Sequence, residues 1–369
     1  MRIVRLLGLL VFLAVVAGGV FVWTNWRELR TFRDTPFGSG SEKIVEIDPG
    51  TSARGVIRRL AEAGALSDEE TAWKYLRMWK RDKRSFKAGE YAFSGPLLPD
   101  DVLERIYKGE VKTWKFTVPE GLRADEIALI VEKASLGKAT EILELVRDPE
   151  FAKELELPFP SLEGFLFPDT YAFPHSARPR DILSAMVARY REAWKRAEAG
   201  RRPGVELDEG QAVILASIIE KETGRADERP RISCVFHNRL AKGMRLETDP
   251  TVMYATMLRS GGRWSRNITK KDLRAPHPYN TYVVTGLPPG PIANPGEAAL
   301  AAALAPSDCK DLYFVSRNDG SHVFCPDLRC HNAAVREWQV EWHRARRAAE
   351  RHEASTAPAP VEASAPPRG

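Results

Sequence analysis

The sequence predicts an α+β protein with a single N-terminal transmembrane helix, a small β-α-α-β domain and a larger mixed α+β domain. An uninterrupted apolar run over residues 6–23 is about long enough to cross a bilayer. After it, a strand, a glycine turn and an amphipathic helix follow one another twice. From residue 163 onward, the chain is rich in loops that combine aromatic residues with Asn, Asp, Thr and Pro.

The composition is that of a globular protein. Of the 369 residues, 43% are hydrophobic and 28% are charged, which is an ordinary balance for a chain with a sizeable core. The 55 basic and 50 acidic residues leave a net charge of +5 that is spread along the chain. A nucleic-acid partner therefore receives little support, because such a partner calls for a concentrated basic surface.

The N-terminal apolar run is interpreted as an uncleaved anchor. Small residues such as Ala17 and Gly19 would suit a signal-peptide cleavage site, but the run continues past them to Trp23 without a polar region. Arginines flank both ends of the run, so charge alone does not set its orientation. A long C-terminal part that follows a short tail favours the N-terminus inside and the domains outside. We predict a cytoplasmic tip and anchor over residues 1–26 and a linker over 27–42.

The small domain is predicted over residues 43–112. A strand is expected at 43–47, followed by a turn that ends in Gly50, two helices, and a second strand at 89–93. Its first part occurs again, because residues 45–56 align with residues 116–127 as a strand, a glycine turn and an amphipathic helix. We interpret this repeat as an internal duplication of a small β–α unit.

The segment 208–224 predicts a buried helix with an unusual end. Asp208 and Gln211 form a capping-box pattern, the next residues are apolar on every side, and Gly224 is suited to end the helix. Glu220 and Glu222 fall in the last turn, where the negative end of the helix dipole disfavours ionised carboxylates. A raised pKa is what a general acid needs near neutral pH. Helical periodicity does not choose between the two glutamates, and a solvated helix end remains the structural alternative.

The loops of the larger domain carry the residue types of a carbohydrate-binding cleft. Aromatic rings pack on the faces of sugars, and amides, hydroxyls and carboxylates bind their hydroxyl groups. Each loop alone is equally explained by the needs of a turn. The candidates for substrate binding are Glu163, Asn238, Arg239, Asp249, Thr251, Tyr254, Asn280, Tyr282 and Asn294.

Other chemistries are poorly supported. The chain has no phosphate-binding Gly-Lys-Ser loop and no Gly-x-Ser-x-Gly elbow, and Ser135 with Lys138 forms a Ser-x-x-Lys match without the Lys-Thr-Gly element that accompanies it. The histidines and cysteines between residues 322 and 331 match no common zinc spacing. We therefore predict no metal and no cofactor.

Four cysteines are compatible with an oxidising compartment but do not establish one. Cys234 lies in an apolar run and is expected to be a free core thiol. Cys325 and Cys330 are close enough in sequence to close a small loop, and the pairing of Cys309 is left open.

Six motifs occur in an order that resembles the endolytic murein transglycosylases, the MltG or YceG-like family. They are Leu-Glu-Gly-Phe-Leu-Phe-Pro-Asp-Thr-Tyr (162–171), Ala-Ser-Ile-Ile-Glu-Lys-Glu-Thr (216–223), Val-Phe-His-Asn-Arg-Leu (235–240), Asp-Pro-Thr-Val-Met-Tyr (249–254), Tyr-Asn-Thr-Tyr (279–282) and Gly-Leu-Pro-Pro-Gly-Pro-Ile-Ala-Asn-Pro-Gly (286–296). The resemblance covers nearly everything from the anchor to about residue 340. It implies one membrane helix, a LysM-like glycan-binding domain at 43–112, a catalytic domain at 113–345, and a catalytic role for Glu220. The Pro/Ala-rich residues 346–369 are expected to be a disordered tail.

The family implies a function at the bacterial cell inner membrane, with the catalytic domain in the periplasm or its extracytoplasmic equivalent. The expected activity is endolytic cleavage of the MurNAc–GlcNAc bond of peptidoglycan with formation of 1,6-anhydro-MurNAc ends, which would limit or terminate nascent strands. Glycan strands and the membrane are the expected partners, and peptidoglycan synthases are a further candidate. The alternative is a non-catalytic, membrane-anchored scaffold that binds cell wall and synthesis proteins.

Overall fold

The structure, a computed structural model, describes residues 2–80, 84–265, 267–342, 344 and 346. It confirms a mixed helix-and-strand protein with one N-terminal apolar helix. The expected disordered tail lies, from residue 347 onward, outside the described residues. The fold divides into two compact units, of which the first combines residues 1–115 with 172–177 and the second combines 116–171 with 178–369. The chain passes between them along β3 (Trp114–Thr117) and β4 (Thr170–Phe173), which pair in a sheet of their own.

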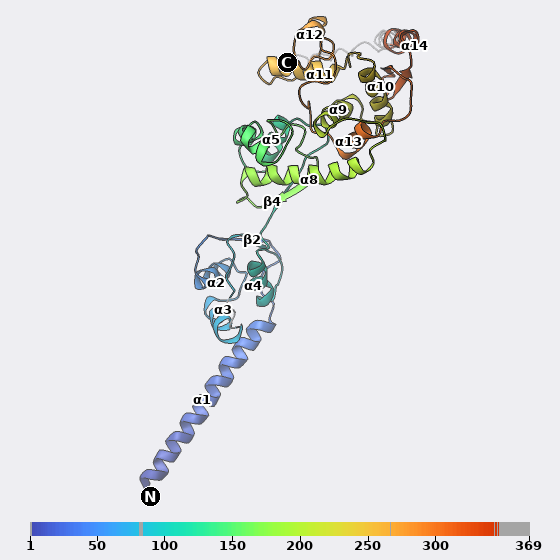
Figure 1. Cartoon of the computed structure of the whole chain (residues 1–369). Helices are drawn as coiled ribbons and strands as arrows, with labels where there is room; N and C mark the ends of the chain where they lie inside the picture. Colours follow the sequence, from blue (N-terminus) through green and yellow to red (C-terminus); the bar gives the residue numbers. More distant parts are fainter. Residues whose placement is uncertain (1, 81–83, 266, 343, 345, 347–369) are drawn as a thin grey trace, which may run out of the picture. The chain divides into compact units, whose positions relative to one another are not determined.

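The N-terminal helix α1 (Arg2–Asp34) has two different surroundings along its length (Figure 1). Its large apolar side chains from Leu6 to Trp23 are exposed, and this stretch is long and apolar enough to cross a membrane. Further along, Leu29 and Phe32 are buried in the core of the first unit. The helix therefore does not end where the linker was expected to begin, and residues 27–34 are helical.

The rest of the first unit surrounds one antiparallel strand pair. β1 (Lys43–Ile47) pairs with β2 (Gly89–Phe93), with Val45 opposite Tyr91, and both strands occur at the predicted residues. The helices α2 (Ala53–Glu62), α3 (Glu69–Lys74) with its π-helical extension to Lys80, and α4 (Pro99–Lys108) contribute the rest of the core. Val45, Ile57, Leu60 and Tyr91 are among the residues at its centre. The β-α-α-β order is thus present, with one further helix after it.

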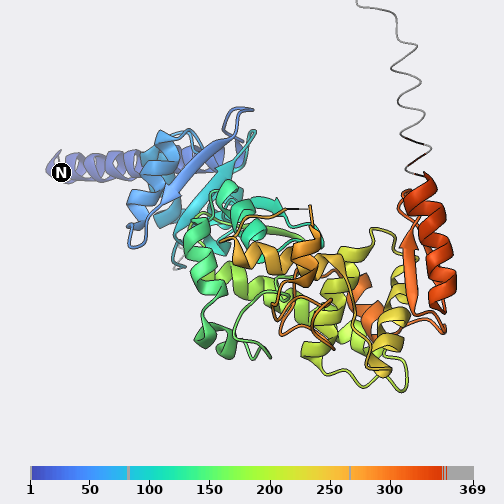
Figure 2. The ribbon, with the colours of Figure 1, turned by 90° about the horizontal axis from the view of Figure 1, so that it is seen from above.

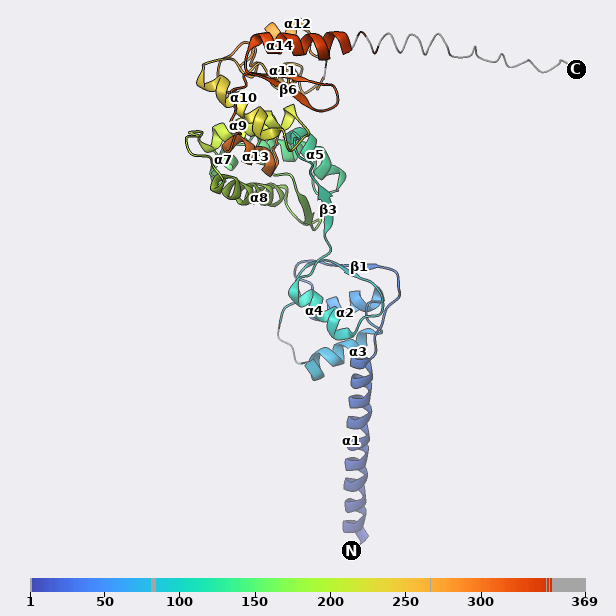
Figure 3. The ribbon, with the colours of Figure 1, turned by 90° about the vertical axis from the view of Figure 1, so that its right-hand side faces the viewer.

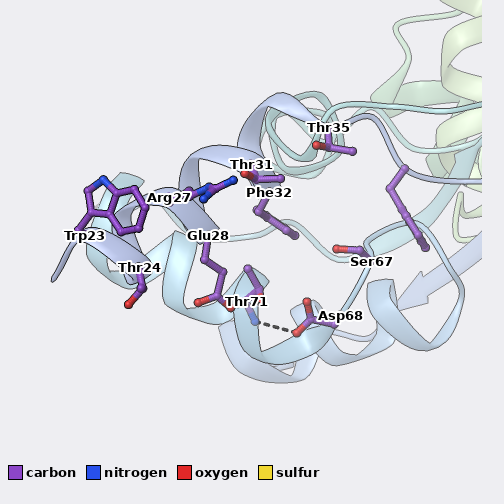
Figure 4. Close-up of a pocket in the computed structure, with 11 residues that line it drawn as sticks. Trp23, Thr24, Arg27, Glu28, Thr31, Phe32, Thr35, Ser67, Asp68 and Thr71 are labelled. Carbon is purple, nitrogen blue, oxygen red and sulfur yellow. Dashed lines mark hydrogen bonds between the residues drawn. The ribbon is translucent and has the colours of Figure 1, made fainter. Parts of the chain in front are cut away.

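A cavity of about 500 Å³ lies between α1 and the turn that leads into α3 (Figure 4). One wall is formed by helix residues that follow the exposed apolar stretch, including Arg27 and Phe32. In the opposite wall, Asp68 caps α3 by accepting a hydrogen bond from the backbone N–H of Thr71 at 2.8 Å. Its lining combines apolar side chains, such as Phe32, with charged and polar ones, such as Arg27 and Asp68.

The second unit is largely helical, and α9 lies at its centre (Figure 3). Because α9 (Glu209–Glu222) is apolar on every side, it packs against α13 (Glu297–Leu304), α10 (Arg229–Ala241) and α11 (Asp249–Arg259). Of these, α13 also contacts α8 (Pro179–Ala199). The other helices that precede the C-terminal part of this unit are α5 (Ala124–Lys133), α6 (Ala139–Val146), α7 (Pro149–Glu154) and α12 (Lys270–Arg274).

The C-terminal part of the second unit is a hairpin of β5 (Tyr313–Ser316) and β6 (His322–Cys325). The helix α14 (Leu328–Val335), with a π-helical extension from Arg336 to Glu341, lies along this hairpin (Figure 2). Val315 and Ala334 are buried between them, so the hairpin and helix form a small core of their own.

The predicted repeat is visible in the local structure of the two copies. β1 leads through Gly50 into α2, and β3 leads through Gly121 into α5. Both glycines have positive φ, 82° and 74°, a conformation that favours glycine over residues with a side chain. The pattern thus marks two equivalent strand–turn–helix units.

The expectation that Cys234 is a free thiol is wrong. Cys234, on α10, forms a disulfide with Cys309, which follows α13, and Cys325 forms one with Cys330. The first pair is separated by 75 residues and the second by 5. The apolar surroundings of Cys234 are real, since it is 4% exposed, but a sequence window around it cannot contain its distant partner.

Candidate active site

The central helix begins as its sequence predicts and ends differently. Asp208 accepts a hydrogen bond from the backbone N–H of Gln211 at 2.7 Å, and the Gln211 side chain accepts one from the N–H of Asp208 at 3.1 Å. This is the expected capping box. At the other end, α9 stops at Glu222 because Thr223 is extended, with φ −142°. The left-handed glycine cap expected at Gly224 is therefore not formed.

Glu220 is held in a nearly closed polar cluster. Its side chain is 6% exposed, and Oε1 accepts a hydrogen bond from Arg229 Nη2 at 2.8 Å. Its other oxygen, Oε2, accepts one from the backbone N–H of Gly296 at 3.1 Å. Burial raises the pKa of Glu220 above its ordinary value, and the charge of Glu120 acts in the same direction, whereas Arg229 and the Gly296 N–H oppose it.

The loop 292–296 fixes this carboxyl group from one side. The backbone N–H of Ile292 donates to Ser217 Oγ on α9 at 3.1 Å, and the N–H of Gly296 reaches Glu220 one turn further along the helix. Between these points, the Asn294 backbone exchanges hydrogen bonds with the turn at 121–122. The Gly-Pro-Ile-Ala-Asn-Pro-Gly motif thus fixes α9 and this turn in one arrangement.

Glu163 occupies a second environment beside the same loop. Its Oε1 accepts hydrogen bonds from the Ala124 N–H at 3.0 Å and from Asn294 Nδ2 at 2.9 Å. The carboxyl group is enclosed by protein, which raises its pKa from 4.5 to about 8 even though these two donors favour the ionised form. It lines a cavity of about 490 Å³ together with Tyr254 and apolar residues of α6 and α11. At neutral pH, a proton on this carboxyl makes it a hydrogen-bond donor.

The raised pKa of Glu163 predicts a specific pH dependence of stability. The folded chain retains this proton up to about pH 8, whereas the unfolded chain loses it near pH 4.5. The free energy of unfolding of the native chain is therefore expected to fall, relative to Glu163→Gln, as the pH rises through this window. Urea unfolding of both proteins at pH 5 and pH 9 measures the change. Glu150→Gln, on the exposed surface of α7, is the matched control, and an equal pH-dependent difference for this variant would refute the explanation.

A third carboxyl environment lies at the same helix end as Glu220. Glu222, half-buried as a residue, lines a cavity of about 410 Å³ with Arg239, Asp249 and Tyr282. The Tyr282 hydroxyl donates to Asp249 Oδ1 at 2.8 Å. Enclosure of the Glu222 carboxyl raises its pKa to about 7, and the charge of Asp249 adds to the effect, while the Thr248 hydroxyl and Arg239 oppose it. The last turn of α9 therefore presents two acids with raised pKa to two different surroundings.

The predicted substrate-binding residues divide into two groups. Five of them line cavities, Glu163 and Tyr254 in one and Arg239, Asp249 and Tyr282 in the other. The other four are either buried or committed to hydrogen bonds inside the protein, and they are Asn238, Thr251, Asn280 and Asn294. Neither of these two cavities is lined by Glu220. The structure does not bring all the candidates together around one carboxyl group.

Asn294 illustrates how the second group is used. It is 1% exposed, and its Oδ1 accepts hydrogen bonds from the backbone N–H groups of Gly164 and Leu166 at 2.8 and 2.9 Å. Its Nδ2 donates to Leu122 O and Glu163 Oε1, both at 2.9 Å. This side chain holds the Glu163 loop and the turn at 121–122 together.

Three residues at the site were not identified from the sequence. Arg229, at the start of α10, and Gly296, at the start of α13, both bind Glu220, and Glu120 contacts Arg229 at 3.3 Å. Glu120 and Gly296 lie 109 and 76 residues from their partners, so no local pattern connects them. The local signals are the Pro-Glu-Gly turn of the repeat, which contains Glu120, and the 286–296 motif, which ends in Gly296.

Comparison with known proteins places these features in a family. Residues 45–337 match the YceG-like family. The chain is 31% identical over 324 residues to the endolytic murein transglycosylase of Bacillus subtilis, covering 82% of this chain and 87% of that protein. It is 27% identical over 364 residues to the protein of the same name from Streptococcus pneumoniae, covering 89% of this chain but 64% of that longer protein.

A solved structure supports the same relationship. The crystal structure of a YceG-like protein from Listeria monocytogenes superposes with a TM-score of 0.51 at 31% identity, covering 80% of this chain and 99% of that one.

Proposed function

The chain belongs to the YceG-like family, and from this premise we propose that it is an endolytic peptidoglycan lytic transglycosylase with Glu220 as general acid and base. Relatives that share most of its length carry the name endolytic murein transglycosylase, so the chain is an enzyme of the lytic transglycosylase class. The observation that carries the assignment of Glu220 is the geometry of its buried carboxyl, which is 6% exposed and accepts hydrogen bonds from Arg229 and from the Gly296 N–H.

The proposed reaction cleaves the MurNAc–GlcNAc bond within a strand. Protonated Glu220 donates its proton to the glycosidic oxygen as the bond to the anomeric carbon breaks, and the resulting carboxylate then accepts the proton of the 6-hydroxyl group. That oxygen closes on the anomeric carbon and leaves a 1,6-anhydro-MurNAc end. Because the nucleophile belongs to the same sugar, its attack gains from proximity and no water molecule has to be activated.

The partners of Glu220 fit both halves of this cycle. Burial favours the protonated acid that begins the reaction. Once the proton has left, Arg229 and the Gly296 N–H, at 2.8 and 3.1 Å, stabilise the carboxylate that must persist until the second transfer. The same two contacts fix the orientation of the carboxyl group toward the sugar.

We propose that the five cavity-lining candidates bind substrate and that the other four support the framework. Tyr254 and Tyr282 offer ring surfaces for sugars, while Glu163, Asp249 and Arg239 offer polar contacts. For Asn238, Thr251, Asn280 and Asn294 the proposed role is to hold the loops in place, since their polar atoms bind neighbouring backbone and side chains.

The proposed setting is the outer face of the inner membrane. The exposed apolar stretch of α1 suits a single span, and two disulfides suit an oxidising, extracytoplasmic compartment. In this proposal, residues 43–112 of the first unit form a LysM-like glycan-binding domain and residues 113–345 form the catalytic domain. The activity is proposed to limit or terminate nascent strands beside the synthases.

Mass spectrometry of peptidoglycan digested by the full chain in detergent tests the proposed function. We expect anhydro-muramyl ends that arise within strands. Reducing ends would identify a hydrolase instead. Binding to peptidoglycan without cleavage under any condition would favour the scaffold.

A further inference from the structure

A second carboxylate lies beside Glu220, although the sequence pattern did not single it out. Glu120 is in the turn between β3 and α5, and its Oε2 contacts Arg229 Nη2 at 3.3 Å. Glu220 Oε1 contacts the same nitrogen at 2.8 Å. Because both oxygens touch one atom, they lie no more than about 6 Å apart. Carboxyl pairs of glycosidases have separations of roughly 5 to 10 Å.

The two carboxyl groups have contrasting surroundings. The Glu220 side chain is 6% exposed, whereas that of Glu120 is 47% exposed. Burial penalises the ionised form of the Glu220 carboxyl, whereas the Glu120 carboxyl remains in contact with solvent. The negative charge of Glu120 is one of the causes that raise the pKa of Glu220. The pair thus has the asymmetry that acid catalysis on a glycosidic bond requires.

The backbone is shaped to admit the Glu120 carboxyl group. A side chain at Gly296 would overlap the Glu120 carboxylate, even though φ at Gly296, −79°, is ordinary for any residue. Glycine leaves room here for the Glu120 side chain in its observed position, and the conformation of Gly296 does not itself call for glycine. The N–H of this same glycine binds Glu220, so one residue accommodates both carboxyl groups.

The two carboxylates do not use the full hydrogen-bonding capacity of the Arg229 guanidinium. Arg229 is 7% exposed, both carboxylates share its Nη2, and its Nε has no hydrogen-bond partner among the described residues. A buried guanidinium that is held at a single nitrogen differs from the bidentate pairs that serve structure alone. The Arg229 guanidinium interacts with two carboxylates at once, and the presence of Glu120 therefore weakens the ion pair between Arg229 and Glu220.

We propose that Glu120 is the second functional carboxylate of this site, which shares the Arg229 guanidinium with Glu220 and stabilises the positive charge that develops on the sugar ring. This rests on the proposed transglycosylase function. As the glycosidic bond breaks, positive charge spreads over the anomeric carbon and ring oxygen, and a fixed negative charge within a few ångströms stabilises it. Glu120 forms no bond to the sugar, because the 6-hydroxyl group supplies the nucleophile.

The test compares Glu120→Gln with the native full chain on isolated glycan strands. We expect kcat to fall about 100-fold with a small change in KM, because the lost interaction matters mainly in the transition state. We also expect the alkaline limb of the pH profile to move to lower pH. Removing the Glu120 charge lowers the pKa of Glu220, so the acid is lost at lower pH. A group that only stabilises the fold would not move this limb.

Three variants complete the experiment. Glu120→Asp, which keeps the charge, is expected to retain the position of the alkaline limb. Gly296→Ala, which displaces the Glu120 carboxyl, is expected to reproduce part of the loss in kcat. Glu297→Gln, next in sequence to Gly296 and paired with Arg196 on the surface, is the matched control and is expected to leave both readouts unchanged.

A direct titration separates this proposal from the proposed function. In ¹³C NMR, the carboxyl of Glu220 is expected to titrate at lower pH in Glu120→Gln than in the native chain, whether or not glycan is cleaved. Native kcat in the variant, or an unmoved Glu220 titration in a folded variant, would overturn the role of Glu120. A native chain that yields no anhydro ends but shows the titration shift would overturn the proposed function alone.

Discussion

Glu220→Gln is expected to lower the rate of anhydro-end formation by about 1,000-fold. Glutamine has nearly the same shape and can still accept the hydrogen bond from the Gly296 N–H, but it cannot give a proton to the glycosidic oxygen. The fold should therefore survive while the first chemical step does not. The measurement is the initial rate at which anhydro-muramyl ends appear from glycan strands, with circular dichroism to confirm folding.

Glu222→Gln is the matched comparison, because Glu222 lies two residues further along the same helix and also has a raised pKa. We expect its rate to remain within about tenfold of the native rate, since Glu222 faces the Asp249 cavity and not Arg229. The reverse ranking, with an active Glu220→Gln and an inactive Glu222→Gln, would transfer the acid role to Glu222. If both variants lost all activity, neither glutamate could be identified as the sole proton donor. This result would contradict the single-acid mechanism.

Removing the Cys234–Cys309 disulfide is expected to cost about 4 kcal/mol of the free energy of unfolding of the second unit. The crosslink spans 75 residues, so it strongly restricts the unfolded chain. It also joins α10, which begins with Arg229, to the segment after α13, which begins beside Gly296. Both residues bind Glu220, and a looser connection should therefore lower activity as well as stability. Urea unfolding of a Cys234→Ser/Cys309→Ser variant measures the first effect, and the cleavage assay measures the second.

The other disulfide supplies the control. Cys325 and Cys330 are 5 residues apart, and the same chain-entropy argument gives only about 2 kcal/mol for their removal. They close the start of α14 and do not touch the Glu220 cluster. An equal loss of stability in the two double variants would show that the length of the crosslinked segment does not determine the stabilisation. The Cys234–Cys309 disulfide would then not be the more stabilising of the two.

Local features were well predicted from the sequence. The capping box at Asp208, the complete burial of the apolar residues of α9 and the strands β1 and β2 all follow from patterns within a few residues. The positive φ of Gly50 and Gly121 follows from the same kind of local pattern. These features depend on backbone propensity and side-chain periodicity, which a short window contains in full.

The surroundings of the carboxyl groups could not be predicted in the same way. The contacts of Glu220 come from a neighbouring helix start and from a glycine 76 residues away, and the partner of Cys234 is as distant. The composition of the polar loops likewise did not reveal what their side chains contact. Asn280 and Asn294 match a sugar-binding composition, but most of their hydrogen bonds go to backbone groups of their own and neighbouring loops. Composition indicates that polar groups are needed, whereas geometry decides whether a ligand or the chain itself satisfies them.

The helix α1 runs without a break from the apolar stretch into the core of the first unit, so it links the position of this unit to that of the membrane span. A flexible linker over the 16 residues 27–42 would let its ends wander over roughly 22 Å. Instead, Leu29 and Phe32 are buried in the core of the first unit, and the backbone of Phe37 is hydrogen-bonded to that of Leu97. The connection between the apolar stretch and the first unit is therefore a continuous helix and not a flexible linker. With residues 6–23 in a membrane, the continuous helix α1 sets the distance and the orientation of the first unit relative to the lipid surface. For the glycan-binding role proposed for residues 43–112, this continuity sets the distance from the membrane at which a strand is bound.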